Sequence, residues 1–239
     1  MHGGRVVHLQ GATFMSLFTK AWLIYRKDML VEYRTRERLT TMFIFSLVVL
    51  VIFNFAFNTG ATAIQSIAPG MIWVAFAFAG MLGANRAFAP ENDLGTFEGL
   101  LLAPIDRGAI YLGKLIGNIT LIGIIELAML PLFALFLNIP ILPYLSKLLV
   151  ILFLGTVGFA SIATLFAAVA VNTRMRDVML PILLLPIASP ILIAGVEMTT
   201  TTFQGGDWEE MSNWLRLLSA FTVVFLVASV LLFDYIVEE

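Results

Sequence analysis

Residues 83–117 read GANRAFAPENDLGTFEGLLLAPIDRGAIYLGKLIG, and they separate two long apolar runs. Charged side chains gather in this stretch, although only 13% of the whole chain is charged. They are Arg86, Glu91, Asp93, Glu98, Asp106, Arg107 and Lys114. Glycines and prolines typical of turns lie among the charges. A charged segment between two apolar runs predicts a loop that joins two membrane spans at one surface of the membrane.

The composition indicates that the solvent of this chain is lipid. Apolar residues make up 60% of its 239 residues and the mean hydropathy is +0.96, whereas soluble proteins average about 45–50% apolar residues. The length predicts a single membrane domain over 1–239, without a separate ATPase or enzyme domain. The net charge of −2 argues against a nucleic-acid partner, and the absence of cysteine excludes disulfides and thiolate metal ligands.

Six apolar runs are long enough to cross a membrane as helices, which takes about 20 mostly apolar residues. They cover roughly 41–57, 67–85, 111–137, 148–171, 179–196 and 217–233. These runs are too long for the strands of a membrane barrel, and they do not alternate between apolar and polar residues. The expected fold is therefore an all-α integral membrane protein with six transmembrane helices.

Lysine and arginine predict the orientation of the spans, because these residues favour cytoplasmic segments. Twelve of the fourteen lie in 1–40, 86–114 and 172–178, and two fall on the other side of a six-span topology. Both termini and the loop of 83–117 are therefore expected in the cytoplasm. The acidic segment 197–212 is expected to be an external loop.

Residues 14–38, before the first span, predict an amphipathic helix that lies along the cytoplasmic surface of the membrane. Aromatic residues and one methionine recur there at spacings of four, three, four and four, and they are Phe18, Trp22, Tyr25, Met29 and Tyr33. Basic residues lie between them, and a helix with aromatic and basic faces is typical of the membrane interface. The alternative is a positively charged flank that only stops translocation.

A short helix is expected over 90–104, because Pro90 favours a helix start and Asp93 a first turn. Its apolar residues share one face, and they are Leu94, Phe97 and Leu101. Glu91 and Glu98 are expected to point away from that face. Such a helix presents an apolar plug surrounded by acidic side chains, which suits docking into a groove on a soluble partner.

Two features inside the spans predict either a pathway or packing. Glu126 lies deep in an apolar run, where a charged carboxylate costs about 2.5–3.5 kcal/mol, and a structural hydrogen bond is favoured over a transport role. The fifth run contains Pro181, Pro186 and Pro190. These prolines predict a bent or broken helix that either lines a pathway or packs with a kink.

Residues 91–118, ENDLGTFEGLLLAPIDRGAIYLGKLIGN, resemble the cytoplasmic loop of ABC-2 type (type V) exporter membrane subunits. The pattern is an acidic residue, Gly-Thr, an apolar residue, Glu, a leucine pair and Pro, followed by Gly-Lys at the next span. The matching residues are Glu91, Gly95, Thr96, Phe97, Glu98, Leu100, Leu101, Pro104, Gly113 and Lys114. Within this class, IAPGMIWVA at 67–75 and the basic stretch at 22–39 are similar to the haem exporter B (CcmB) family. Asn92 and Asp93 depart from the further acidic residue and glycine that the family often has.

The resemblance implies a non-catalytic permease subunit for haem export, or for release of a haem-loaded chaperone, in cytochrome c maturation. The ATPase would be a separate chain, CcmA, contacted through Glu91, Asp93, Thr96, Phe97, Glu98, Leu100, Leu101 and Pro104. Further partners would be CcmC, CcmD and CcmE, a second copy of this chain and the lipid of a bacterial inner membrane. No resident cofactor or metal is expected on this chain, and haem would be a transient substrate.

Other functions stay open at this point. They are export of a drug, lipid or glycan, a scaffold that does not transport, and an intramembrane enzyme. The enzyme is disfavoured because Glu126 has no catalytic partner in a motif. An ATP site at 108–115, GAIYLGKL, is not expected, because Leu115 stands where a P-loop carries its Mg²⁺-binding hydroxyl.

Overall fold

The computed structural model describes residues 7–56, 61–93, 95, 106–171, 173 and 176–236. Within these ranges the chain forms helices and no strand. The helices are α1 (Val7–Thr35), α2 (Glu37–Ala56), α3 (Ala61–Asn85), α4 (Ala89–Asp93), α6 (Arg107–Leu137), the 3₁₀ helix η1 (Leu142–Tyr144), α7 (Leu145–Ala170), α8 (Arg176–Phe203) and α9 (Ser212–Ile236). The predicted all-α class is confirmed.

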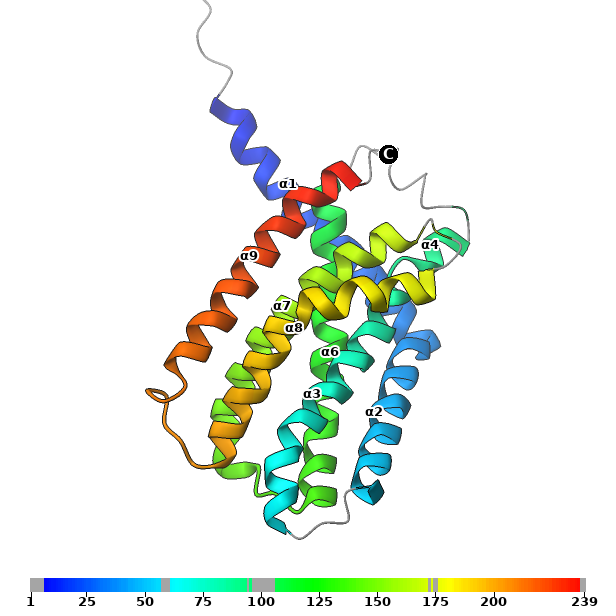
Figure 1. The fold of residues 1–239 in the computed structure, drawn as a ribbon. Helices are drawn as coiled ribbons and strands as arrows, with labels where there is room; N and C mark the ends of the chain where they lie inside the picture. Colours follow the sequence, from blue (N-terminus) through cyan, green and yellow to red (C-terminus); the bar gives the residue numbers. More distant parts are fainter. Residues whose placement is uncertain are drawn as a thin grey trace, which may run out of the picture.

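Six helices in the described part of the chain are long and apolar enough to cross a membrane: α2, α3, α6, α7, α8 and α9. They form one bundle, and the start of α1 and the end of α9 lie at the same end of it (Figure 1). The inner helices are α3 and α7, with 72% of the span residues buried, against 17% in α2 and α9. The exposed apolar surface of α2 and α9 therefore suits contact with lipid.

Close contact between the inner helices depends on glycine. The indole ring of Trp73 on α3 lies where a side chain at Gly155 of α7 or Gly195 of α8 would stand. Its ring N–H donates a hydrogen bond of 3.0 Å to the hydroxyl of Thr199. Three helices therefore meet around one buried aromatic residue.

Helix α8 continues further than the sequence predicts. The external loop expected over 197–212 begins only after Phe203, so the prediction is wrong for 197–203. Threonine hydroxyls in this part donate to the carbonyl four residues earlier, as Thr199 does to Gly195 and Thr202 to Met198, each at 2.7 Å. These bonds give the buried hydroxyl groups acceptors within the helix itself, so the threonine-rich segment can stay helical without polar partners from outside.

The prolines of α8 produce the predicted bend without ending the helix. Figure 1 shows that α8 changes direction along its length. Pro190 has no N–H to donate to the carbonyl of Pro186, and the hydroxyl of Ser189 donates to that carbonyl instead, at 2.7 Å. Side-chain hydroxyls of this kind let a helix tolerate proline in a membrane. Whether these prolines line a pathway stays a prediction.

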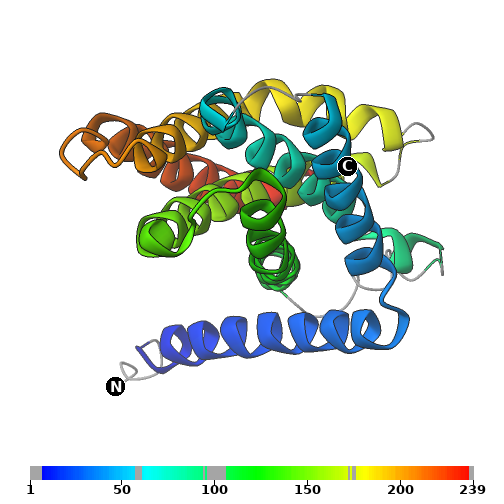
Figure 2. The ribbon, with the colours of Figure 1, turned by 90° about the horizontal axis from the view of Figure 1, so that it is seen from below.

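Helix α1 lies across the spans. It is seen along its full length in Figure 2, whereas α6 is viewed almost end-on. A single residue separates it from α2: Arg36, in the left-handed region with φ of 54°. The carboxylate of Glu32 accepts a hydrogen bond of 2.9 Å from the backbone N–H of Leu39 in the first turn of α2. This bond fixes the angle between the surface helix and the first span.

Candidate functional site

The segment expected to contact an ATPase is only partly described. Helix α4 contains Glu91 and the backbone of Asp93, and it is followed by Gly95 with φ of 63°. The other expected contact residues lie outside the described residues, and they are Thr96, Phe97, Glu98, Leu100, Leu101 and Pro104. The described part of the site consists of α4 and of the two helices that contact it, α1 and α6.

Lys114 lies where α1, α4 and α6 meet, and its side chain is only 1% exposed. Its ammonium group donates to the carbonyl of Ala87 and to a carboxylate oxygen of Glu91, both at 2.7 Å. It also lies 3.0 Å from a carboxylate oxygen of Asp28 on α1. A lysine ammonium has three donors, so these three acceptors satisfy it.

A second lysine completes the group. Lys27 of α1 contacts Glu91 and lies 3.1 Å from Asp28. We call Lys27, Asp28, Glu91 and Lys114 the Lys114 cluster. Burial alone would lower the pKa of Lys27, but its hydrogen bonds and ion pairs with Glu91 and Asp28 outweigh burial and raise that pKa. A raised lysine pKa keeps the stabilising charge at neutral pH, and the contribution is lost only as the pH rises through the folded-state pKa.

The side chain of Glu91 is 8% exposed and turned toward the two lysines. The apolar face that it is expected to point away from lies outside the described residues, so that expectation stays a prediction. The expectation treated 90–104 as an isolated helix, and it left out the bases that α1 and α6 bring close. The sequence contains one sign that α1 forms a polar contact inside the protein: Asp28 and Glu32 share a helix face with the apolar residues Ala21 and Ile24. In the structure that face packs on α6.

The P-loop-like residues 108–115 instead provide a packing surface at the start of α6. A Cβ atom at Gly113 would lie 2.8 Å from the carbonyl oxygen of Ala21 and 2.8 Å from a side-chain atom of Ile24. Only glycine allows α1 to approach this closely. The Gly113-Lys114 pair therefore places the lysine beside α1 and α4.

A chain of hydrogen-bonded polar side chains connects the first span, α2, with α6 and α7. Arg38 of α2 donates to the side-chain oxygen of Asn118 on α6. Asn118 donates to the hydroxyl of Thr164 on α7 at 2.8 Å, and that hydroxyl donates to the carbonyl of Ala160 at 2.7 Å. Sequence reasoning missed this chain, because Asn118 and Thr164 are single polar residues in apolar runs.

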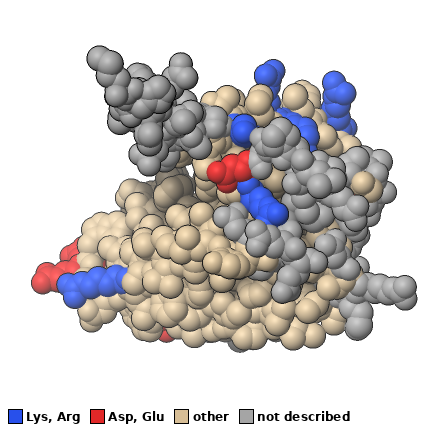
Figure 3. Space-filling view, turned by 90° about the horizontal axis from the view of Figure 1, so that it is seen from above, with Lys and Arg blue, Asp and Glu red and all other residues tan. Residues whose placement is uncertain are grey.

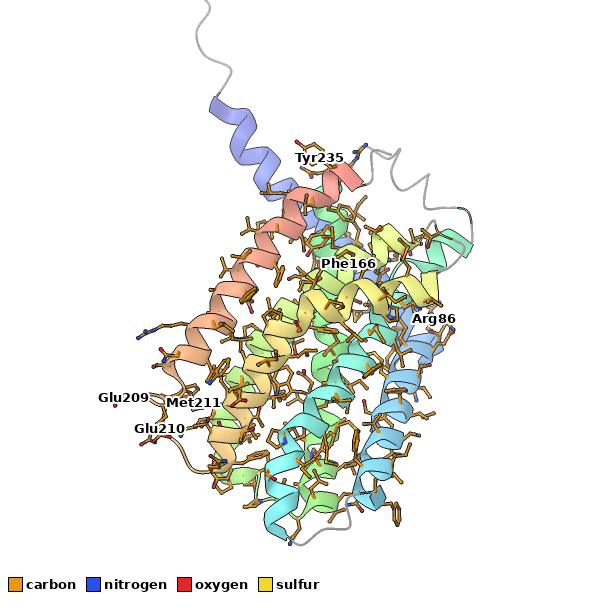
Figure 4. The ribbon with its side chains drawn as sticks, in the orientation of Figure 1. Arg86, Phe166, Glu209, Glu210, Met211 and Tyr235 are labelled. Carbon is orange, nitrogen blue, oxygen red and sulfur yellow. The ribbon has the colours of Figure 1, made fainter. Side chains whose placement is uncertain are left out.

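The two ends of the bundle differ in charge. Arg86 pairs with Glu37 at the end that carries α1 and α4, and Figure 4 places Arg86 far from Glu209 and Glu210. Viewed from the α1 end, Lys and Arg gather on the side where α1 lies (Figure 3). At the opposite end Lys147 donates to the carbonyl of Gly206 at 2.8 Å. The basic end is the one expected in the cytoplasm.

Glu126 makes the hydrogen bond that the sequence predicts. The hydroxyl of Thr156 on α7 donates to its carboxyl group at 2.6 Å, and Glu126 is buried. The bond joins α6 to α7 through the interior. A role of Glu126 in transport stays a prediction.

Comparisons with known proteins agree with the resemblance of the loop and of IAPGMIWVA. A family model described as CcmB protein matches residues 19–236. Heme exporter protein B of Pseudomonas aeruginosa is 27% identical over 198 residues, which cover 83% of this chain and 88% of that protein. The protein of the same name from Rhodobacter capsulatus is 31% identical over 179 residues, 75% of this chain and 82% of that protein.

A third relative with that name, from Paracoccus denitrificans, is 30% identical over 164 residues, covering 68% of this chain and 74% of that protein. The family match extends over nearly the whole chain and includes α1 from residue 19 onward, all six spans and the Lys114 cluster. The chain therefore belongs to the CcmB family.

Proposed function

We propose that this chain is the membrane permease subunit of a haem exporter that acts in cytochrome c maturation. The observation that carries the proposal is the CcmB family match over 19–236, together with relatives named heme exporter protein B. Six apolar helices supply the membrane-spanning body that such a subunit needs. The energy of ATP hydrolysis either moves haem itself or releases haem-loaded CcmE from CcmC.

ATP hydrolysis takes place on a separate CcmA-like ATPase, which binds the segment 90–104 at the basic end of the bundle. Movement of that segment reaches α6 and α1 through the Lys114 cluster, because Glu91 contacts Lys114 directly and Asp28 lies on the other side of the same ammonium group. Breaking a buried ion pair costs about 3–5 kcal/mol. The start of the segment, α6 and α1 therefore move together.

The hydrogen-bonded chain from Arg38 through Asn118 to Thr164 carries the movement onward to α2 and α7. The basic end faces the cytoplasm of a bacterial cell and the chain spans its inner membrane, as the lysine and arginine pattern supports. CcmC, with CcmD and CcmE, and a second copy of the chain complete the complex. Haem passes along this subunit without a resident ligand.

The test is co-expression of the chain with the CcmA-like ATPase and CcmC of the same organism. After purification in mild detergent, ATP hydrolysis is measured with and without haem-loaded CcmE. We expect the ATPase to co-purify and haem-loaded CcmE to increase hydrolysis above the rate with haem-free CcmE. An ATPase that co-purifies but responds equally to both forms of CcmE would contradict the assignment to haem.

A further inference from the structure

The outward side of α1 alternates arginine with aliphatic residues. We call this surface the outer groove; it has a volume of about 380 Å³ and is lined by Leu23, Arg26, Lys27, Leu30, Val31 and Arg34. Residues four apart lie above one another on a helix, so Leu30 stands between two arginines in one row. Leu23 and Leu30 are 57% and 51% exposed. Large aliphatic side chains therefore lie open beside basic ones.

The two arginines of the outer groove are exposed, and neither forms an ion pair with a residue in the described ranges. Lys27 differs from them, because its ammonium group is turned inward to Asp28 and Glu91. The guanidinium groups of Arg26 and Arg34 are therefore accessible to an anionic ligand from outside the chain. They are eight residues apart, which is about 12 Å along a helix.

The position of α1 indicates which ligand reaches the groove. Arg34 lies two residues before Arg36, the residue that separates α1 from α2, the first membrane span. The adjoining face of α1 exposes Trp22 and Tyr33, residue types that concentrate at the boundary between membrane and water. The outer groove therefore lies at the level of lipid headgroups.

We propose that the outer groove binds the headgroup phosphates of anionic phospholipid. Each of the two guanidinium groups binds phosphate oxygens through paired N–H donors. The acyl chains of the same lipid cover Leu23 and Leu30. One ligand then provides both kinds of contact that alternate along α1, anionic and apolar.

The experiment uses the full chain purified in detergent and titrated with phosphatidylglycerol or with phosphatidylcholine. Native mass spectrometry counts the lipid that stays bound. The test variant is Arg26→Gln/Arg34→Gln, and the matched control is Arg216→Gln, an exposed arginine near the start of α9. We expect the native chain to prefer phosphatidylglycerol, and this preference to weaken at high salt.

Each arginine lost near an anionic surface should lower phosphatidylglycerol affinity about fivefold, so the double variant should lose roughly 25-fold and the control should lose little. Arg26→Lys/Arg34→Lys should bind more phosphatidylglycerol than the double glutamine variant and less than the native chain, because lysine keeps the charge but lacks the paired donors. Leu23→Ser/Leu30→Ser should bind less of both lipids. Gel filtration checks that all variants remain monodisperse.

Equal phosphatidylglycerol binding by the native chain and the double glutamine variant would overturn the proposal, as would an equal loss in Arg216→Gln. A third result would also overturn it: lipid binding that is unchanged while the co-expressed ATPase no longer co-purifies with the double variant. In that case the outer groove would be a docking surface for a protein.

Discussion

In the sequence Lys114 is one of several charged residues in a loop, whereas in the structure its side chain is only 1% exposed. Its Gly-Lys motif and its family resemblance could be read from the sequence. Its acceptors could not, because Asp28 lies 86 positions earlier in the chain. A contact of that kind depends on how α1 crosses α6, and a local pattern does not contain this geometry.

Replacing Lys114 with methionine should destabilise the chain strongly. The substitution keeps the length of the side chain but removes the buried ammonium group from Asp28 and Glu91, and the other lysine of the cluster, Lys27, has a side chain that is 49% exposed. Removing one partner of a buried ion pair costs about 3–5 kcal/mol. The free energy of unfolding in mixed micelles measures the effect.

The matched control for Lys114→Met is Arg86→Gln, which removes the exposed pair with Glu37. Exposed pairs contribute about 0–1 kcal/mol, so the control should remain close to the native chain. Equal stability of the two variants would show that the Lys114 cluster does not hold α1, α4 and α6 together.

At the scale of elements, hydropathy predicts the spans well, because a membrane helix needs a continuous apolar run. Hydropathy predicts the end of a helix less well where polar side chains form hydrogen bonds within the same helix, as the threonines of α8 do beyond residue 196. The spacing within α1 predicts a helix with an aromatic face, and Trp22 and Tyr33 are indeed exposed. It did not identify the neighbouring face, centred on Ala21 and Ile24, that packs on α6.

Gly113→Ala should separate α1 from α6. The new Cβ atom would lie 2.8 Å from backbone and side-chain atoms of Ala21 and Ile24, closer than real contacts allow. The control is Gly123→Ala on the same helix, where nothing lies within 4 Å of the new atom and alanine favours the helix by about 0.5–1 kcal/mol.

The chain contains no cysteine, so maleimide labelling of Ile24→Cys can measure the separation of α1 from α6. Labelling should be faster in the Gly113→Ala background and unchanged in the Gly123→Ala background. Slow labelling in both would mean that α1 does not depend on the close approach at Gly113.

The segment 90–104 carries its own prediction. The Phe97→Asp variant should insert into the membrane normally, but the ATPase should no longer co-purify with it. The reason is that the aspartate charge would stay unpaired in the apolar groove of the ATPase. Leu142→Asp, at an 85% exposed position at the opposite end of the bundle, controls for expression and insertion. Recovery of the ATPase at the native level with Phe97→Asp would rule out docking through this residue.

At the scale of the whole molecule, the charge difference between the two ends predicts a topology. A reporter that is active only outside the cytoplasm should work after Gly206 and fail after Arg107 or Arg176. The first position lies in the turn between α8 and α9, and the other two begin α6 and α8 at the basic end. Activity after Arg107 would invert the orientation.

The purified chain without partners should not hold haem stably. A stable haem needs an axial ligand from His, Cys, Met or Tyr in a shaped pocket. The chain has no cysteine, and its two histidines, His2 and His8, stand at the N-terminus before the spans. A sharp Soret band that survives gel filtration and shifts on mutation of a span Met or Tyr would make the chain a direct haem carrier.

The central claim is that the start of the ATPase-binding segment, α1 and α6 move as one unit through the Lys114 cluster. Spin labels at Tyr33→Cys on α1 and Leu127→Cys on α6, both at exposed positions, report their separation by pulsed electron resonance in the complex with the ATPase. A second pair, Tyr33→Cys and Trp208→Cys, reports α1 against the other end of the bundle. We predict that ATP leaves the first distance unchanged and shifts the second, and that Lys114→Met broadens the first. A shift of the first distance in the native chain would contradict the account.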